Sequence, residues 1–300
     1  MSTDDLRIID AHIHLWDLAK LRYGWLTDGY IDDLLAVPYK PICRDYLIEE
    51  YVAEVKQSNV VAAVHIQAAL DHPDPVDETK WLQESADNAD FPMSIIGAAD
   101  LLSSTLENDL DRHAEFSRFC GVRMLRVDEN MFQDSNFRHG LKSIGDRGLV
   151  FDLDVHWESM DAAAKLAIDF PDIQFVLNHA GFPIERTPEY YDNWKRGMSR
   201  LAEPSNVVCK ISGLGMYDPD WTTETIKPWF DHALDCFGVS RCMLASNWPL
   251  DSLFSTYDDL ISAYKALLTG YSSSERQAVA AENARNYYRV DMGSHSAGDQ

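Results

Sequence analysis

Short apolar runs alternate with amphipathic stretches along most of the chain. Eight runs are mostly apolar and often β-branched, as expected for strands that are buried on both faces of a parallel sheet. They cover residues 7–11, 60–66, 94–99, 122–127, 149–155, 174–177, 206–211 and 241–245. Successive runs begin about 33 residues apart, which leaves room for a strand, a crossover helix and two short loops.

Apolar residues at i, i+3 and i+4 fill several of the intervals between these runs. This spacing predicts helices over residues 45–57, 77–89, 160–170, 223–237 and 274–288. Pro171 stops the third helix, and Gly238 is a candidate C-cap of the fourth. Pro228 lies inside the fourth stretch and predicts either a kink or a later helix start.

Eight strands alternating with helices predict an α/β fold, a single-domain (β/α)8 TIM barrel over residues 1–290. The competing interpretation is an open, doubly wound sheet, which usually has fewer strands and a GxGxxG first turn. No such motif occurs here. In a barrel, catalytic groups gather at the C-terminal ends of the strands.

Residues 16–43 interrupt the alternation with a long polar and aromatic loop. A loop of this length is either a lid or binding loop, or a surface excursion with its own small aromatic core. Its aromatic residues include Trp16, Tyr23, Trp25, Tyr30 and Tyr39. At the other end of the chain, residues 291–300 are polar and predict a flexible tail.

The chain is strongly acidic, with 26 Lys and Arg against 49 Asp and Glu and a net charge of −23. Such a surface repels phosphate backbones and anionic lipid, so nucleic acid and membranes are not expected partners. No apolar run approaches the length of a membrane span, and the N-terminus lacks the pattern of a secretion signal. The five cysteines are scattered without a CxxC pair, which favours a reducing compartment, so we expect a cytoplasmic protein. Whether copies of the chain associate as a homo-oligomer is left open.

Histidines mark the ends of several predicted strands. His12 and His14 end the first strand two residues apart, so both imidazoles point to one side, as a chelating pair for Zn²⁺ would. His156 ends the fifth strand and His179 follows the sixth. Taken singly, either is more often a half-buried structural histidine, but the C-terminal ends of barrel strands converge. The sequence therefore predicts a cluster of imidazoles at the mouth of the barrel.

Two arginines lie on the fourth predicted strand. A buried guanidinium is costly unless it meets an anion. Arg123 and Arg126 are three residues apart, so regular strand geometry places them on opposite faces. We expect at least one to face the mouth and bind a carboxylate or lactone oxygen of a substrate. Asp152 or Asp154 is the candidate structural partner for the other.

Four further side chains near strand ends are candidate substrate ligands. Gln67 follows the second strand, and Lys210 lies on the seventh, either as a cation at the mouth or as the partner of a neighbouring acid. Trp16 opens the long loop. Trp248 follows the eighth strand and either walls the mouth or packs within its loop.

Several segments together resemble the amidohydrolase superfamily, in the TIM-barrel metal-dependent hydrolase branch (amidohydrolase 2) that includes sugar-lactone hydrolases and lactonases of aromatic degradation. These segments extend over nearly the whole chain. They are Ile9-Asp10-Ala11-His12-Ile13-His14-Leu15-Trp16, Glu78-Thr79-Lys80-Trp81-Leu82, Gly121-Val122-Arg123, Asn178-His179-Ala180-Gly181-Phe182-Pro183, Cys209-Lys210-Ile211-Ser212-Gly213-Leu214, Ser246-Asn247-Trp248-Pro249 and Glu282-Asn283-Ala284.

The resemblance also identifies one departure from the family pattern. It implies an aspartate after the eighth strand, in a Ser-Asp-Trp-Pro segment, that activates water or shuttles the proton. This chain has Asn247 there, and an amide cannot accept a proton at neutral pH. Asp251 could replace that aspartate if its loop returns it to the mouth. Some members of the branch resemble zinc or manganese enzymes and others work without metal, so both remain open.

From these observations we expect a hydrolase that opens a small lactone, either a sugar lactone or one that carries a carboxylate. In the metal-dependent form, His12, His14 and His156 would hold one divalent ion that generates hydroxide. His179 would polarise the carbonyl or bind the oxyanion, and Asn247 would orient the water. The alternatives are a zinc-dependent decarboxylase on the same scaffold and a non-catalytic protein that binds a small molecule.

Overall fold

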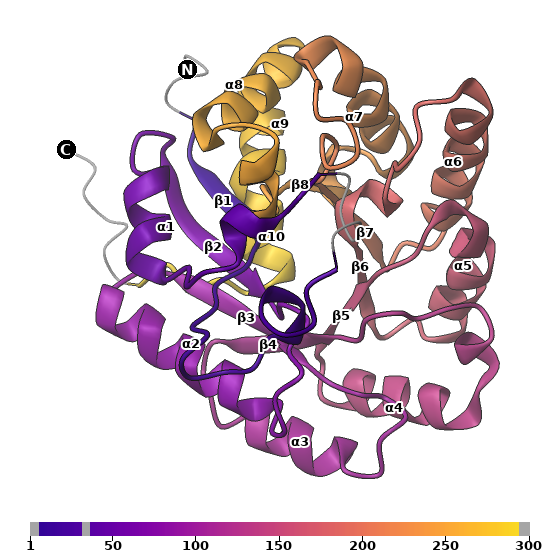
Figure 1. The fold of residues 1–300 in the computed structure, drawn as a ribbon. Helices are drawn as coiled ribbons and strands as arrows, with labels where there is room; N and C mark the ends of the chain where they lie inside the picture. The colour runs from indigo at the N-terminus through magenta and orange to yellow at the C-terminus, as the bar shows by residue number, and fades with distance from the viewer. Residues whose placement is uncertain (1–5, 32–36, 294–300) are drawn as a thin grey trace.

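The computed structural model describes residues 6–31 and 37–293, and its centre is one sheet of eight parallel strands (Figure 1). Each strand pairs with the next along the chain, in the order β1 to β8. The end of the first strand is joined to the segment after the last strand by hydrogen bonds from His14 N to Trp248 O (2.7 Å) and from Asn247 N to His12 O (2.9 Å). The strands are β1 (Ile8–Ile13), β2 (Val60–Ile66), β3 (Met93–Ala98), β4 (Phe119–Arg123), β5 (Val150–Leu153), β6 (Gln174–Leu177), β7 (Val207–Ile211) and β8 (Cys242–Leu244). The predicted (β/α)8 barrel is confirmed.

All eight predicted strands are present, and the fourth differs most from its prediction. β4 begins three residues earlier than the apolar run and ends at Arg123. Gly121 lies against β5 so closely that a Cβ there would be 2.4 Å from the Val150 carbonyl oxygen. Because β4 ends at Arg123, Arg126 lies beyond the strand, with a positive φ of 60°. The expected placement of the two arginines on opposite faces of one strand therefore does not apply.

In the described part of the chain, the helices α1 to α8 surround the sheet (Figure 1). The predictions for α1, α2, α5 and α7 are confirmed to within a few residues. Thr222 caps α7 and Pro228 lies inside it, so the later start that Pro228 suggested does not occur; Gly238 is the C-cap, with φ of 75°. The helices are α1 (Ile48–Val55), α2 (Val76–Ala89), α3 (Leu106–His113), α4 (Ser135–Asp146), α5 (Met160–Asp169), α6 (Pro188–Leu201), α7 (Thr223–Phe237) and α8 (Tyr257–Leu267).

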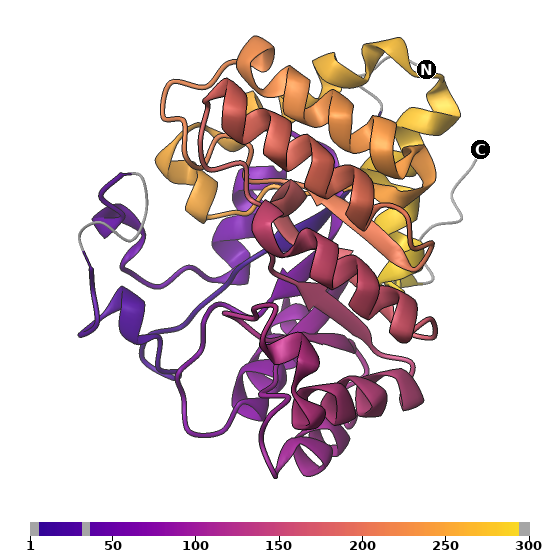
Figure 2. The same ribbon diagram turned by 90° about the vertical axis from the view of Figure 1, so that its right-hand side faces the viewer.

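The predicted C-terminal helix is divided into three pieces. They are α9 (Ser273–Gln277), the π-helical segment η10 (Ala278–Glu282) and α10 (Asn283–Tyr287). Asn283 Nδ2 donates to the carbonyls of Val239 (2.7 Å) and Cys242 (2.8 Å), at the start of β8. Figure 2 shows this yellow segment at one end of the barrel and the indigo loop after β1 at the other. The C-terminal segment therefore covers the end opposite to the mouth.

The long loop after β1 contains two short 3-10 helices, η2 (Gly24–Leu26) and η3 (Lys40–Ile42). Its aromatic rings pack on one another, with ring centroids 5.6 Å apart for Trp16 and Trp25 and 5.7 Å apart for Trp25 and Tyr39. Tyr23 OH donates to Glu78 Oε1 on α2 (2.8 Å). The loop thus has its own small aromatic core, which is one of the two interpretations of its sequence. The hydrogen bond from Tyr23 to Glu78 attaches it to the barrel beside the mouth.

Within the described residues, no helix combines the length and the apolar character that crossing a membrane requires. All five cysteines are free thiols. The flexible tail predicted over residues 291–300 lies outside the described residues from 294 onward.

Candidate active site

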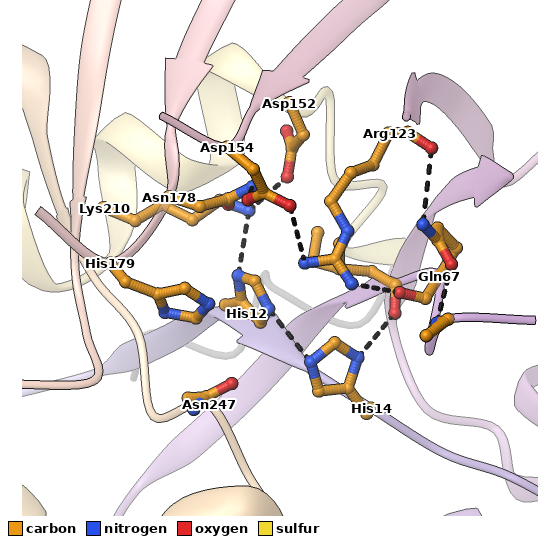
Figure 3. Close-up of polar contacts among 12 residues, drawn as sticks. His12, His14, Gln67, Arg123, Asp152, Asp154, Asn178, His179, Lys210 and Asn247 are labelled. Atoms are coloured by element: carbon orange, nitrogen blue, oxygen red, sulfur yellow. Dashed lines mark hydrogen bonds and ion pairs between the residues drawn. The ribbon is translucent and has the colours of Figure 1, made fainter. Parts of the chain in front are cut away.

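Three histidines meet at the C-terminal end of the barrel (Figure 3). His12 and His14 come from the end of β1, and their Nε2 atoms are 3.1 Å apart. His179 comes from the turn after β6, and its ring centroid is 4.4 Å from that of His12. All three side chains are buried. The structure therefore brings together three of the four histidines that the sequence placed at the mouth.

Two of these rings are oriented by neighbours on their Nδ1 side. His14 Nδ1 lies 2.7 Å from the Ile66 carbonyl oxygen, and His179 Nδ1 lies 2.9 Å from Ser212 Oγ. Burial lowers the pKa of all three imidazoles well below the ordinary value. The positive charge of Arg123 adds to this effect at all three, and that of Lys210 adds to it at His12 and His179. The cluster is therefore neutral at pH 7.

Lys210 lies under the cluster in a fully buried polar chain. Its Nζ is 2.5 Å from Asp152 Oδ2 and 3.3 Å from His12 Nδ1. Tyr288 OH donates to the other oxygen of Asp152 (2.7 Å). Burial lowers the pKa of Lys210 to about 8, and Asp152 opposes this effect. Lys210 is thus both the partner of an acid and a neighbour of the imidazoles.

Arg123 reaches the site from the end of β4. Its guanidinium donates to the Gln67 carbonyl and lies 3.7 Å from Asp154 Oδ2, one of the two carboxylates expected as a partner. Asn178 Nδ2 donates to Asp154 Oδ1 (2.7 Å). Burial raises the pKa of Asp154, and Arg123 opposes this effect. The positive charge therefore lies beside the histidines and is only partly neutralised.

A cavity of about 540 Å³ opens at the ends of β2, β3 and β4, and Gln67, Arg123 and Arg126 line it. This volume is within the range of small-molecule sites. Arg126 is exposed and also lines a neighbouring cavity of about 350 Å³, together with Trp25 of the long loop. A larger cavity, of about 750 Å³, lies among the N-terminal ends of β2 to β4 and contains none of the predicted site residues.

Asn247 is buried after β8, beside His179 in Figure 3. Its Nδ2 donates to Asp251 Oδ1 (2.7 Å), so the loop does return Asp251 to Asn247. Burial raises the pKa of Asp251 to about 8. Among the described residues, nothing forms a hydrogen bond with the Asn247 Oδ1 oxygen. The amide therefore has one free acceptor, which suits a water molecule or a substrate hydroxyl.

Three predicted site residues lie apart from the cluster. The exposed ring of His156 stacks on Phe182, with centroids 4.9 Å apart, and Phe182 in turn contacts His179. Trp16 and Trp248 line a separate cavity of about 350 Å³. Their indole nitrogens donate to the Arg44 carbonyl (2.6 Å) and to Glu54 (2.9 Å), so both rings are anchored away from the imidazoles.

The donor set does not fit a resident divalent ion. Over residues 6–31 and 37–293, no group of three His, Cys, Asp or Glu side chains is placed to hold a metal. Two imidazole nitrogens converge, but His12 also faces the Lys210 amine, and the residue after β8 is an amide instead of a carboxylate. Two neutral ligands beside two cations make a poor site for Zn²⁺.

Other polar residues of the site carried no functional assignment from the sequence. Ser212 was visible in the segment after β7, but its contact with His179 depends on the pairing of β6 and β7. Tyr288 comes from the far end of the chain and has no local signal. Glu78 belongs to a segment that carries the family resemblance, yet nothing in that segment predicts its burial beside Tyr23.

A (β/α)8 barrel with a His-x-His pair at the end of β1 and a third histidine after β6 is the arrangement that the resemblance to the amidohydrolase superfamily implies. The amidohydrolase family model matches residues 9–290. The chain therefore belongs to the amidohydrolase family, and it is an enzyme of the hydrolase type.

The chain is similar to named proteins over nearly its whole length. The uncharacterized protein y4mH of Sinorhizobium fredii is 40% identical, with 95% of this chain and 99% of that protein covered. The L-fucono-1,5-lactonase of Burkholderia ambifaria is 27% identical, with 97% and 98% covered. A solved amidohydrolase of Burkholderia multivorans with bound zinc has a TM-score of 0.81 and 26% identity, with 95% and 100% covered.

Proposed function

We propose that this chain hydrolyses a small, polyhydroxylated lactone, the substrate class that the name of its Burkholderia ambifaria relative indicates. The similarity to that lactonase extends over both chains. The observation that carries the proposal is the meeting of three neutral imidazoles beside the free Asn247 oxygen. Arg123 acts electrostatically on His179 and also lines the cavity of about 540 Å³, which the three histidines do not line themselves.

The proposed reaction uses the side chains of the protein. Water adds to the lactone carbonyl, with one hydrogen held by Asn247 Oδ1 and the other proton accepted by His179 Nε2. Arg123 stabilises the oxyanion that forms, because its positive charge acts in a buried site. The ring C–O bond then breaks, and His179 returns its proton to the leaving oxygen. The products are a hydroxyl group and a carboxylic acid that releases a proton to solvent.

That released proton provides the test. We expect a pH-indicator assay to show turnover with at least one sugar 1,4- or 1,5-lactone. The His179→Asn variant should reduce kcat by about 100-fold or more, the usual contribution of a general base. His139→Asn, an exposed histidine on α4, is the matched control and should retain the wild-type kcat.

Three other results would contradict the proposal. Turnover of carboxylate-bearing lactones alone would show that the proposed substrate class is wrong. Release of CO₂ from aromatic or β-keto acids, without lactone opening, would indicate the decarboxylase alternative. Tight binding of sugar lactones without turnover would indicate a binding protein that has lost its base.

A further inference from the structure

We propose that Lys210 is a positioning residue that holds the hydrogen of His12 on Nε2, so that a hydrogen bond to His14 occupies the place of a metal ion. The geometry that supports this is a chain of contacts that begins at Lys210, which Asp152 holds, and continues through His12 and His14 to the Ile66 carbonyl. Figure 3 shows Asp152, Lys210, His12 and His14. The inference deepens the proposed function, but its test needs no substrate.

The tautomer of His14 follows from its backbone partner. His14 Nδ1 is 2.7 Å from the Ile66 carbonyl oxygen, and a carbonyl can only accept a hydrogen bond. The hydrogen of neutral His14 is therefore on Nδ1. Its Nε2 carries a lone pair, which faces His12 Nε2 at 3.1 Å.

The tautomer of His12 follows from Lys210. An ammonium group has three donors and no acceptor, and Lys210 Nζ is 3.3 Å from His12 Nδ1. His12 Nδ1 must therefore accept, so the hydrogen of neutral His12 is on Nε2 and points at the His14 lone pair. Two lone pairs facing each other at this distance would repel, so the hydrogen bond also explains the short separation.

Lys210 is itself held in place from below. Asp152 Oδ2 accepts from its Nζ at 2.5 Å, and Tyr288 OH donates to Asp152 Oδ1 at 2.7 Å. The Nζ also lies 5.0 Å from the centre of the Tyr288 ring. Lys210 and Asp152 are fully buried, so each is the main compensation for the charge of the other. The ammonium therefore has little freedom to turn away from His12.

This arrangement opposes chelation by the His-x-His pair. A metal ion needs a lone pair on each Nε2, so the His12 hydrogen would have to move to Nδ1. On Nδ1 the hydrogen would point at the ammonium of Lys210, and the Lys210 N–H would lose the His12 nitrogen as its acceptor. A carboxylate after β8 could offset the added charge, but this chain has Asn247 in that position.

The test is nitrogen-15 NMR of the full-length protein labelled at histidine, at pH 7, with assignments from His12→Gln and His14→Gln variants. We expect one neutral tautomer at each position, with the hydrogen on Nε2 of His12 and on Nδ1 of His14. In Lys210→Met, His12 should lose this single tautomer. Tyr288→Phe retains the Lys210 contact and should leave the His12 signals in the Nε2–H pattern. A hydrogen on Nδ1 of His12 in the wild-type protein would overturn the inference.

A second readout is metal affinity, measured by titration with Zn²⁺ or Co²⁺ alone. We expect Lys210→Met to bind at least about tenfold more tightly than the wild-type protein, a difference of ~1.4 kcal/mol. Equal affinities in a folded variant would overturn the role of Lys210 in excluding metal. If circular dichroism shows that Lys210→Met is unfolded, the tautomer of His12 measured in the wild-type protein alone supports or overturns the inference. Inactivity toward every lactone would contradict the proposed function while leaving both readouts interpretable.

Discussion

Asn247 is the residue that most constrains the chemistry of this site. It holds the position where the family pattern has an aspartate, and its amide bonds to Asp251 four residues further on. A carboxyl group is therefore present in the loop after β8, but it is bonded to the Asn247 amide. The free Oδ1 of Asn247 can orient water, and the proton must be taken by an imidazole whose pKa is lowered by burial.

Replacing this amide by a carboxylate tests whether the rest of the site is competent. Asn247→Asp should raise kcat for lactone hydrolysis by about 100-fold, because it supplies a positioned general base. The new carboxylate would lie against Asp251, and two adjacent carboxylates raise the pKa of one of them. The rate should therefore increase with pH through that raised pKa, which a pH profile of kcat would record.

The double variant Asn247→Asp, Asp251→Asn is the control for that pH profile. It retains the new base but removes its neighbour, so its activity should extend to lower pH. An Asn247→Asp variant that binds lactones normally without any gain in turnover would instead support the binding-protein alternative.

At the scale of elements, the long loop after β1 is joined to α2 by a buried acid. Glu78 accepts from Tyr23 OH (2.8 Å) and from the Ala68 amide (3.3 Å), and its Oε2 has no partner among the described residues. Burial raises the pKa of Glu78 to about 7, from an ordinary value of 4.5. This acid therefore makes the packing of the loop sensitive to pH.

Glu78→Gln should change how stability depends on pH. The folded state holds the Glu78 proton more tightly than the unfolded state does. The contribution of Glu78 to the free energy of unfolding is therefore fully present below pH 4.5 and is lost as the pH rises through about 7. Wild type and variant should therefore be similar in stability at pH 4.5. At pH 8 the variant should be more stable, by up to about 3 kcal/mol. Urea unfolding at both pH values measures this, and a difference that does not vary with pH would contradict it.

The elements themselves were predictable to different degrees. The bounds of β2, β6 and α7 agree with the predicted ranges, because their periodicity is strong and their ends are marked by turn residues. The sequence predicted no helix at the positions of α3, α4, α6 and α8. α3 buries only Leu106, Leu110 and His113, a stripe too narrow to be distinctive in the sequence.

At the scale of the whole molecule, the C-terminal segment closes the barrel at the end opposite to the site. Asn283 supplies two hydrogen bonds to carbonyls around the start of β8, and Tyr288 reaches Asp152 inside the barrel. The last helical segment is therefore part of the barrel, and part of the support of the site.

Asn283→Ala should destabilise the protein by about 2 kcal/mol, because it leaves buried carbonyl groups without their donors. The free energy of urea unfolding is the measurement. Asn108→Ala, at an exposed position on α3, is the matched control and should change the stability by no more than about 0.5 kcal/mol. Equal effects of the two substitutions would show that the C-terminal segment does not contribute to the stability of the barrel.

The sequence by itself determined the order of eight strands, the mouth of the barrel and the side-by-side pair of His12 and His14, because hydrophobic alternation and strand geometry are local properties. Only the tertiary structure decided that His156 stacks on Phe182, that Asp251 bonds to Asn247, and that Lys210 lies between Asp152 and His12. Asp152 is 58 residues from Lys210 and 136 residues from Tyr288. Contacts at such separations depend on how strands and loops converge when the barrel closes, and no local pattern of residues encodes that convergence.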